Sequence, residues 1–248
     1  MIEVRQLSKA FGAQKVLADV NLRIESGESV AIIGRSGGGK SVLLKHIIAL
    51  LQPDAGDVLI DGESIVRMNE RQLLRIREKF GMVFQGAALF DSMTVAENVA
   101  FGLRRHEHLT EAEIAKRVAA ALDMVDLPGT EKKNPAELSG GMRKRVGLAR
   151  AIIYGPQIVI YDEPTTGLDP IVSDSIDKLI IRVRDQLKVT SVVVTHDMRS
   201  ARRVGNRVLM LHEKKIYANA APEEFFASQD PIVRQFIDGV ADPQEAIF

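Results

Sequence analysis

One eight-residue segment constrains the fold of this chain more than any other part of its sequence. It is Gly34-Arg35-Ser36-Gly37-Gly38-Gly39-Lys40-Ser41, and it matches the pattern G-x-x-x-x-G-K-[ST]. A continuously apolar run precedes it at residues 29–33, and an apolar helical pattern follows it at residues 42–51. Glycines in such a turn let successive backbone N–H groups converge on phosphate oxygens, and the helix N-terminus adds favourable partial charge. We therefore expect a phosphate-binding loop between a strand and a helix, with Lys40 on the terminal phosphates and Ser41 on Mg²⁺.

Two later strands are predicted to end at the same site. The runs at residues 158–161 and 191–195 are as apolar as residues 29–33, which is typical of strands buried on both faces of a parallel sheet. Asp162 follows the first of these runs and His196 follows the second. Because ligands of open α/β sheets bind at the carboxyl ends of parallel strands, we expect one composite site.

Asp162 and Glu163 are adjacent carboxylates directly after a predicted strand. Mg²⁺ keeps several waters and takes few protein carboxylates, so we expect Asp162 to hold the ion, usually through water. Side chains alternate along a strand, so Glu163 can point elsewhere, toward the γ-phosphate and its attacking water. Because the pair occurs together with a phosphate loop, we predict that Glu163 is the general base of a hydrolysis reaction.

The remaining patterns predict one domain, residues 1–248, with a helical insertion. Period-two alternation at residues 2–4 and 20–24 predicts an antiparallel β region near the N-terminus. An inserted helical subdomain is expected at about residues 86–155, with helices at residues 94–103, 110–125 and 139–154. A tail at about residues 222–248 contains a helix start at Pro222 and a second helical stretch at residues 230–240.

Composition excludes several classes of protein. The 33 basic and 33 acidic residues give a formal net charge of zero, so no strong positive field favours nucleic acid, and we expect no nucleic-acid partner. The chain has no cysteine, which excludes disulfide frameworks and thiolate metal sites. Its first residues lack the apolar stretch of a signal peptide, and its apolar runs are too short to span a membrane. Any membrane role is therefore expected to be peripheral.

The segment Leu138-Ser139-Gly140-Gly141-Met142 resembles the LSGGQ signature of ABC ATPases. The resemblance implies an α/β P-loop NTPase of the ABC type, with a parallel core sheet, an antiparallel β region and an inserted helical subdomain. It also implies that ATP and Mg²⁺ are bound, and that two copies form a head-to-tail homodimer. In that dimer Ser139, Gly140 and Gly141 would close over ATP held by the other subunit, because a helix N-terminus is an anion site. Met142 departs from the usual Gln, which leaves only the hydrogen bonds of that side chain in question.

Four further positions match motifs of the same family, and the resemblance covers nearly the whole chain. Phe11 matches the aromatic residue that stacks on adenine, with a core position as the alternative for a single aromatic. Gln85 matches the lid glutamine that contacts Mg²⁺ or water and senses the membrane partner. Asp169 matches the loop that crosses the dimer interface. His196 matches the switch histidine on the γ-phosphate.

Two segments narrow the resemblance to the ATPases of maintenance-of-lipid-asymmetry (Mla) transporters. Residues 85–101 are similar to the lid region of that family, and residues 230–239 are similar to its C-terminal segment, whereas Gly102 replaces a common Pro. The likeness implies phospholipid transport between the inner membrane and the periplasm or outer membrane. The implied partners are a membrane permease, a small regulatory subunit and a periplasmic lipid-binding protein, with this chain on the cytoplasmic face of the inner membrane. The alternatives are the ATPase of a small-solute importer, for example for amino acids, and a soluble ABC ATPase outside transport.

Two charged segments allow more than one interpretation. Arg143-Lys144-Arg145 either helps to neutralise phosphate across the dimer or only decorates the signature helix. His106-Glu107-His108 could suggest a metal pair, but no third ligand is in view, and we expect a solvated loop.

Overall fold

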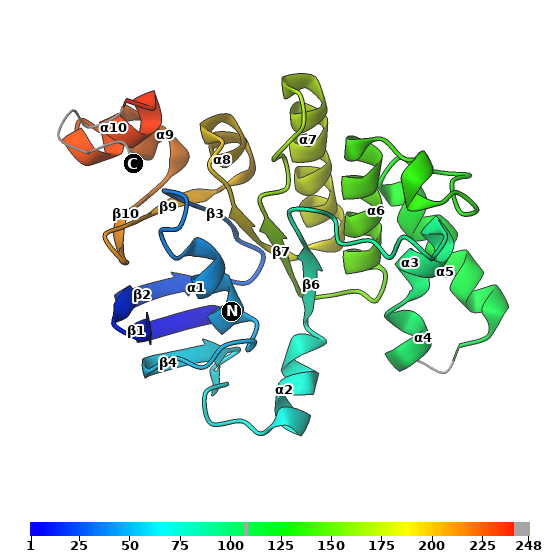
Figure 1. Ribbon diagram of the computed structural model, residues 1–248, viewed down its shortest axis with the longest axis horizontal. Coiled ribbons are helices and arrows are strands. Elements are labelled where there is room, and N and C mark those ends of the chain that lie inside the picture. The colour runs from blue at the N-terminus through cyan, green and yellow to red at the C-terminus, as the bar shows by residue number, and fades with distance from the viewer. Residues whose placement is uncertain (107–108, 241–248) are drawn as a thin grey trace.

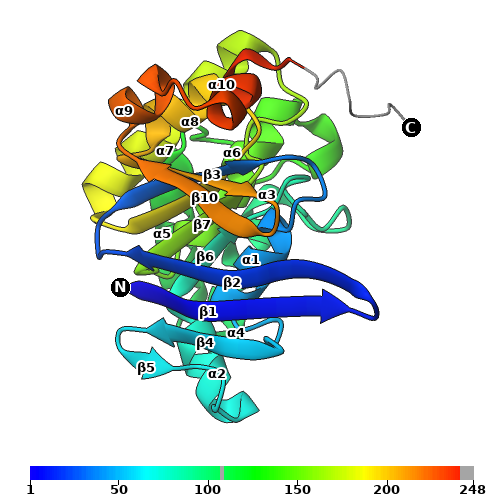
Figure 2. The same cartoon turned by 90° about the vertical axis from the view of Figure 1, so that its left-hand side faces the viewer.

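Two β-sheets and the helices around them form the structure, a computed structural model that describes residues 1–106 and 109–240. The larger sheet has six strands in the order β10-β9-β3-β8-β7-β6, and the smaller has four in the order β2-β1-β4-β5 (Figures 1 and 2). The chain is therefore α/β, with parallel strands in one sheet and antiparallel strands in the other, as predicted.

The larger sheet contains all three strands predicted to end at the site. Its members are β3 (Ser29–Gly34), β6 (Phe80–Val83), β7 (Ile158–Asp162), β8 (Thr190–Val194), β9 (Arg207–His212) and β10 (Lys215–Ala220). Neighbouring strands pair in parallel from β9 to β6, and only the edge strand β10 runs antiparallel. Every residue of β3 and β8 is buried, which explains why these strands show continuous apolar runs and no alternation.

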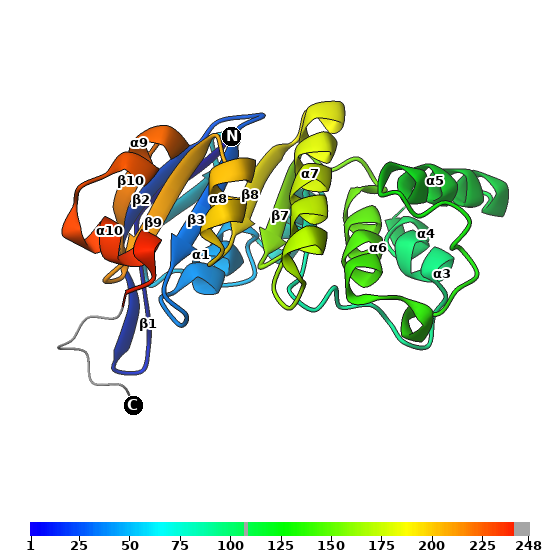
Figure 3. The same ribbon diagram turned by 90° about the horizontal axis from the view of Figure 1, so that it is seen from above.

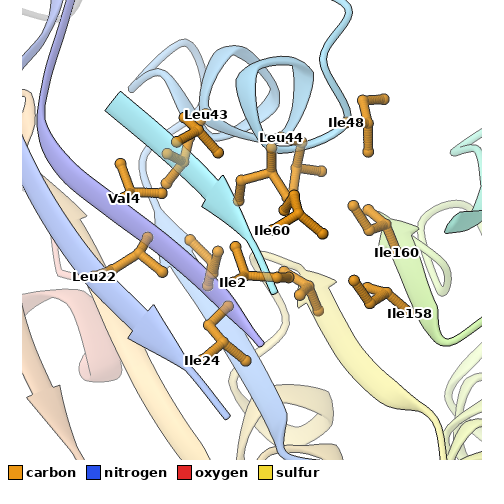
Figure 4. Close-up of a cluster of buried hydrophobic side chains, with 14 of the residues drawn as sticks. Ile2, Val4, Leu22, Ile24, Leu43, Leu44, Ile48, Ile60, Ile158 and Ile160 are labelled. Carbon is orange, nitrogen blue, oxygen red and sulfur yellow. The ribbon is translucent and has the colours of Figure 1, made fainter. Parts of the chain in front are cut away.

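The smaller sheet forms the antiparallel region predicted near the N-terminus. It comprises β1 (Ile2–Phe11), β2 (Gln14–Ile24), β4 (Ala55–Ile60) and β5 (Glu63–Ser64). Helix α1 (Lys40–Ile47) lies between the two sheets, and Leu43 and Leu44 pack on isoleucines from both (Figure 4). This apolar cluster fixes the helix that begins at the phosphate loop.

The two faces of the larger sheet bury alternate residues of each strand. Ile158 and Ile160 of β7 contribute to the cluster with α1, whereas Val159 and Tyr161 face a second cluster that includes residues of α6 and α7. Helices α7 (Pro170–Leu187) and α8 (Met198–Val204) cover this second face (Figure 3). Helix α2 (Glu70–Arg77) precedes β6.

Helices gather at one end of the molecule, beyond β7 (Figures 1 and 3). They are α3 (Val95–Ala100), α4 (Leu103–His106), α5 (Glu111–Met124), the short 3₁₀ helix η1 (Pro135–Glu137) and α6 (Gly140–Ile152). Thr94 and Thr110 begin α3 and α5 with capping boxes to Glu97 and Glu113. The second and third predicted helices are confirmed as α5 and α6, whereas the first ends at Ala100 and is followed by α4 as a separate short helix.

The C-terminal residues pack at the opposite end of the larger sheet (Figure 3). Helices α9 (Pro222–Ala227) and α10 (Pro231–Asp238) bury Phe225 and Val233 against β9 and β3 residues, which confirms both helical stretches predicted there. Residues 241–248 of the predicted tail lie outside the described residues, as do Glu107 and His108 of the possible metal pair. Among the described residues, no helix has the length and apolar character needed to cross a bilayer.

Candidate functional site

Three parallel strands bring the predicted site residues to one edge of the larger sheet. Strand β8 lies between β3 and β7, and all three run in the same direction. Gly34 ends β3, Asp162 ends β7, and His196 follows β8 by two residues. The composite site expected from the strand ends is thereby assembled.

The phosphate loop connects β3 to α1 in a conformation that needs glycine. Gly39 caps α1 with φ of 96°, and a Cβ there would lie 3.0 Å from the Leu17 side chain. No side chain caps this helix N-terminus. The Lys40 Nζ donates to the carbonyls of Gly34 at 2.7 Å and Arg35 at 3.0 Å. The loop therefore combines a helix N-terminus open to an anion with a cation at its centre.

Lys40 is held in a buried position close to two carboxylates. Burial lowers the pKa of Lys40, and the negative charges of Glu163 and Asp162 oppose that change. The ammonium group therefore has counter-charges on β7 and in the turn after it. An incoming phosphate group would offer the same ammonium a further, stronger partner.

Asp162 has the character of a cation ligand. Its Oδ1 atom is buried and has no hydrogen-bond partner among the described residues, and its carboxylate accepts a hydrogen bond from the Ser41 hydroxyl. Burial and the nearby charge of Glu163 raise the pKa of Asp162, whereas Lys40 and Ser41 act in the opposite direction. An orphaned carboxylate oxygen beside a serine hydroxyl fits Mg²⁺, which takes few protein ligands. No group of three or more acidic, His or Cys side chains suited to a metal occurs in the described residues.

Glu163 contacts His196 directly, which the sequence did not reveal. The His196 Nδ1 lies 2.7 Å from the Glu163 Oε2, and the Thr166 hydroxyl donates to the same oxygen at 3.1 Å. Because an ionised carboxylate can only accept, the Nδ1 must carry the hydrogen when Glu163 is charged. The backbone of Glu163 is left-handed, with φ of 52°. Such a conformation in a non-glycine residue is strained and concentrates at functional sites.

Gln85 lies in the lid loop, which we define as residues 84–90 between β6 and the helical end of the molecule. Its side chain is exposed, and its backbone carbonyl accepts a hydrogen bond from Lys144 of α6. Lys144 also donates to the Glu163 carbonyl at 3.3 Å. Sequence reasoning left the role of Lys144 open, because a run of three cations does not indicate which of them is buried.

Phe11 lies at the end of β1, in the hairpin with β2. Its ring is 49% exposed, and the Lys9 ammonium lies 5.6 Å from the ring centroid. A core position, the alternative for a single aromatic, is therefore excluded. The same hairpin contributes Val16 and Leu17, which border Gly39 of the phosphate loop. An exposed ring on this hairpin is free to stack on a planar base, and adenine stacking stays a prediction.

The signature segment is at a helix N-terminus, as predicted, but it does not meet the phosphate loop of its own chain. Ser139 caps α6, and its hydroxyl accepts from the Met142 N–H at 3.3 Å. Helices α6 and α1 lie on opposite sides of α7 in two views (Figures 1 and 3). Gly141 packs so closely on α7 that a Cβ would lie 2.7 Å from Val172. Asp169 caps α7 by accepting from the Ile171 N–H at 2.9 Å and the Val172 N–H at 3.0 Å.

Comparison with known proteins places this chain in a family. The family described as ABC transporter matches residues 17–166. The probable ribonucleotide transport ATP-binding protein mkl of Mycobacterium leprae is 44% identical over 238 residues, which cover 96% of this chain and 69% of that protein. Its counterpart in Mycobacterium tuberculosis strain H37Rv has the same identity, and the match covers 66% of its length.

Two relatives are similar in length to this chain. The intermembrane phospholipid transport system ATP-binding protein MlaF of Haemophilus influenzae is 40% identical over 98% of this chain and 92% of that protein. MlaF of Escherichia coli K12 is 39% identical over 98% of this chain and 90% of that protein.

Solved structures of ABC transporter proteins are also similar to this chain. The dimeric post-hydrolysis state of the ATP-binding cassette MJ0796, bound to ADP and Pi, matches with a TM-score of 0.82 and 33% identity over 90% of this chain and 99% of that chain. The cbiO1 protein of Clostridium perfringens, part of the transporter complex cbiONQ, matches with a TM-score of 0.86 and 32% identity over 94% of this chain and 93% of that chain. With its phosphate loop, paired carboxylates and signature helix in this arrangement, the chain belongs to the ABC transporter family, as an ATP-binding subunit that hydrolyses ATP.

Proposed function

We propose that Glu163 is the general base for ATP hydrolysis at the edge where β3, β7 and β8 end. The surroundings of Asp162 are the main support for placing the reaction here. Its buried Oδ1 has no hydrogen-bond partner among the described residues, and the Ser41 hydroxyl and the positive charge of Lys40 lie close to its carboxylate. Ser41, Asp162 and the Gln85 side chain would hold Mg²⁺, which neutralises phosphate charge when bound. Lys40 and the N–H groups of residues 34–41 bind the phosphates. Glu163 takes the proton of the attacking water, while His196 contacts the γ-phosphate and Phe11 stacks on adenine.

The site is completed by a second copy of this chain in a head-to-tail dimer. Within one subunit, Ser139 at the N-terminus of α6 is separated from α1 by α7. Its helix N-terminus nevertheless has the features of an anion site: the Ser139 hydroxyl caps the Met142 N–H, and Gly140 and Gly141 add no side chains to the first turn. We infer that Ser139, Gly140 and Gly141 close over ATP bound to the other subunit, with Asp169 at the crossing point. The post-hydrolysis MJ0796 cassette, a dimer bound to ADP and Pi, supports this inference.

The transported substrate is proposed to be a phospholipid. MlaF proteins are named for intermembrane phospholipid transport and match this chain over nearly the whole length of both. Burying each methylene is worth about 0.8 kcal/mol, so passing a two-chain lipid through water costs on the order of 25 kcal/mol. The membrane partner must therefore supply a shielded apolar path, and ATP-driven closure times the transfer. We place the chain on the cytoplasmic face of the inner membrane, bound to its permease, with a regulatory subunit and a periplasmic lipid-binding protein in the same system.

Ribonucleotide transport is a second candidate, because the mycobacterial relatives named for it are 44% identical to this chain. The two candidates differ in the chemistry of the cargo, since a ribonucleotide is charged and hydrophilic whereas a phospholipid carries two acyl chains. An importer of another small solute, such as an amino acid, would also carry a hydrophilic cargo.

The test is to co-express the chain with its permease, purify the complex and identify bound small molecules by mass spectrometry. The complex is then reconstituted in vesicles containing fluorescent phospholipid, and transfer to an acceptor is measured with ATP. Complexes carrying Glu163→Gln serve as the control for ATP dependence. Phospholipid bound to the complex and transferred with ATP is the expected result. Uptake of a radiolabelled ribonucleotide or amino acid without lipid transfer would overturn it.

A further inference from the structure

Lys144 is a buried cation on the signature helix that the proposed mechanism does not use. Lys144 is 7% exposed, and Lys40 of the phosphate loop is the other buried lysine among the described residues. Burial lowers the pKa of Lys144, and the negative charge of Glu163 opposes that change. Both acceptors of its ammonium are main-chain carbonyls, those of Gln85 and Glu163. A desolvated cation is expensive, so its retention at this place calls for an explanation.

The two carbonyls belong to the two loops that carry the proposed base and the lid glutamine. Glu163 has a left-handed backbone, with φ of 52°. Its N–H donates to the Val194 carbonyl at 2.9 Å, and its carbonyl accepts from the Thr166 N–H at 3.3 Å and from Lys144 at 3.3 Å. Strained conformations persist only where surrounding contacts impose them. Of these three main-chain contacts, the one from Lys144 comes from outside β7, β8 and the turn itself.

The same face of α6 also binds the rest of the lid loop. Arg150 donates to the carbonyls of Ala87 and Ala88 at 2.7 Å each, and both alanines have left-handed backbones. Gly147 lies between the two cations on the helix and packs against Ala87: a Cβ on Gly147 would lie 3.4 Å from the Ala87 Cβ. Residues spaced by three lie on one face of a helix, so positions 144, 147 and 150 form one surface against the lid loop. Lys144 is the member of this surface that reaches both the lid loop and Glu163.

We propose that Lys144 is a positioning residue for hydrolysis: its ammonium fixes the Glu163 backbone and the Gln85 carbonyl relative to the signature helix. The inference rests on the proposed role of Glu163 as the base. It predicts that removing the ammonium misplaces the base without weakening the phosphate loop. Small displacements of a reacting group are costly in rate, so kcat should fall by about 10-fold to 100-fold. The affinity for ATP should stay within about twofold, because the Lys144 ammonium donates to the carbonyls of Gln85 and Glu163, which lie outside the phosphate loop.

The experiment measures ATP binding, single-turnover hydrolysis and thermal unfolding of the Lys144→Met variant. The matched control is Lys116→Met, because Lys116 is an exposed lysine of α5 in the same helical region. Lys144→Arg keeps a buried donor and should recover at least part of kcat, which a simple packing defect would not allow. If Lys144→Met does not fold, Lys144→Gln gives the same comparison. Unchanged kcat in these variants, or an equal loss in the Lys116 control, would overturn the proposal.

A double-variant cycle separates this proposal from the proposed role of Glu163. If Lys144 acts by positioning Glu163, adding Lys144→Met to Glu163→Gln should slow hydrolysis by less than about twofold beyond Glu163→Gln alone. If Glu163→Gln is slow and the two losses multiply, Lys144 acts independently of the base and the positioning role is wrong. If Glu163→Gln hydrolyses ATP at a near-normal rate, the assignment of the base fails first, and the inference about Lys144 fails with it.

Discussion

Glu163 uses the same carboxylate oxygen for its contacts with Thr166 and His196. Oε2 accepts from the Thr166 hydroxyl and contacts His196, so both contacts orient the group through the same atom. Oε1 is the oxygen that neither contact uses. The His196 ring is 62% exposed, so its second nitrogen can reach a nucleotide brought to the edge of the sheet. If Glu163 is the base and His196 contacts the γ-phosphate, as proposed, one imidazole would link the two, with the hydrogen on Nδ1 when Glu163 is charged.

Replacing Glu163 by Gln should remove the proton acceptor while sparing ATP binding. The amide keeps the shape of the side chain but cannot take up the proton of water, so hydrolysis should slow by about 10²–10⁴-fold, the usual contribution of a positioned base. This corresponds to roughly 3–5 kcal/mol of activation free energy. If hydrolysis separates the subunits of the proposed dimer, the variant should accumulate as a dimer with Mg-ATP. Single-turnover hydrolysis and size-exclusion chromatography measure the two effects, with Glu224→Gln as an exposed control. Near-normal hydrolysis would move the role of base to His196.

Asp177 should make the free energy of unfolding depend on pH. Its residue is 3% exposed on α7, its Oδ1 has no partner, and its Oδ2 accepts from the Ser200 hydroxyl at 2.9 Å. Burial, with a smaller effect of Asp197, raises the pKa of Asp177 to about 6 from 3.8. The folded state therefore binds the proton more tightly than the unfolded state. This contribution to stability is complete below pH 3.8 and is lost as the pH rises through about 6.

The Asp177→Asn variant should remove this dependence, because an amide does not titrate in this range. The variant should gain about 1–2 kcal/mol of unfolding free energy relative to the parent between pH 5 and pH 8, after allowing for relaxation around the buried charge. Urea unfolding at a series of pH values measures the difference. Asp185→Asn, at an exposed position near the end of α7, is the matched control. A constant difference between variant and parent over this range would show that Asp177 is charged throughout.

Strand β6 and helix α6 approach each other so closely that only glycine fits between them. A Cβ on Gly81 would lie 2.3 Å from the Ala151 carbonyl oxygen, which is backbone and cannot rotate away. Gly81→Ala should therefore lower the free energy of unfolding by about 1–3 kcal/mol through overpacking. Gly86→Ala is the matched control, because no atom lies within 4 Å of its Cβ position. Denaturant unfolding of the two variants tests this, and equal stability would mean that β6 and α6 can separate at little cost.

Helices and strands whose own residues form a recognisable pattern could be predicted from the sequence. Buried strands such as Ser29–Gly34 show continuous apolar runs, and α5 begins at a Thr110 cap with Glu113 three residues later. The phosphate loop, Asp162 and His196 could be predicted to lie at one edge of the sheet because each follows a recognisable strand. Contacts between segments had no such signal: the Glu163 pair with His196 joins β7 and β8, and Lys144 becomes buried only because α6 packs on the lid loop. The sequence around Lys144 is equally charged on both sides, so its burial is a tertiary property.

The separation of the signature from the phosphate loop within one chain is the basis for proposing that the active unit is a dimer. Each composite site would take its phosphate loop from one protomer and Ser139 from the other. Lys40→Ala disables the first component and Ser139→Arg obstructs the second, because a bulky cation fills the anion site. Each variant alone should therefore form dimers with no intact site. A mixed dimer of the two differs, since one of its two sites combines an unaltered phosphate loop with an unaltered signature.

Mixing the two variants should consequently restore ATP hydrolysis. In an equal mixture half of the dimers are mixed and each has one intact site, so activity of about a quarter of the parent is expected if the sites act independently. The assay is single-turnover hydrolysis of the mixture beside each variant alone. Lys40→Ala mixed with the Lys40→Ala, Ser139→Arg double variant is the control, because no pairing of those chains gives an intact site. Equilibrium binding of ATP should survive in Ser139→Arg, whose own phosphate loop is unaltered. Complementation would require that sites be shared between subunits, whereas a mixture no more active than its components would contradict the head-to-tail arrangement.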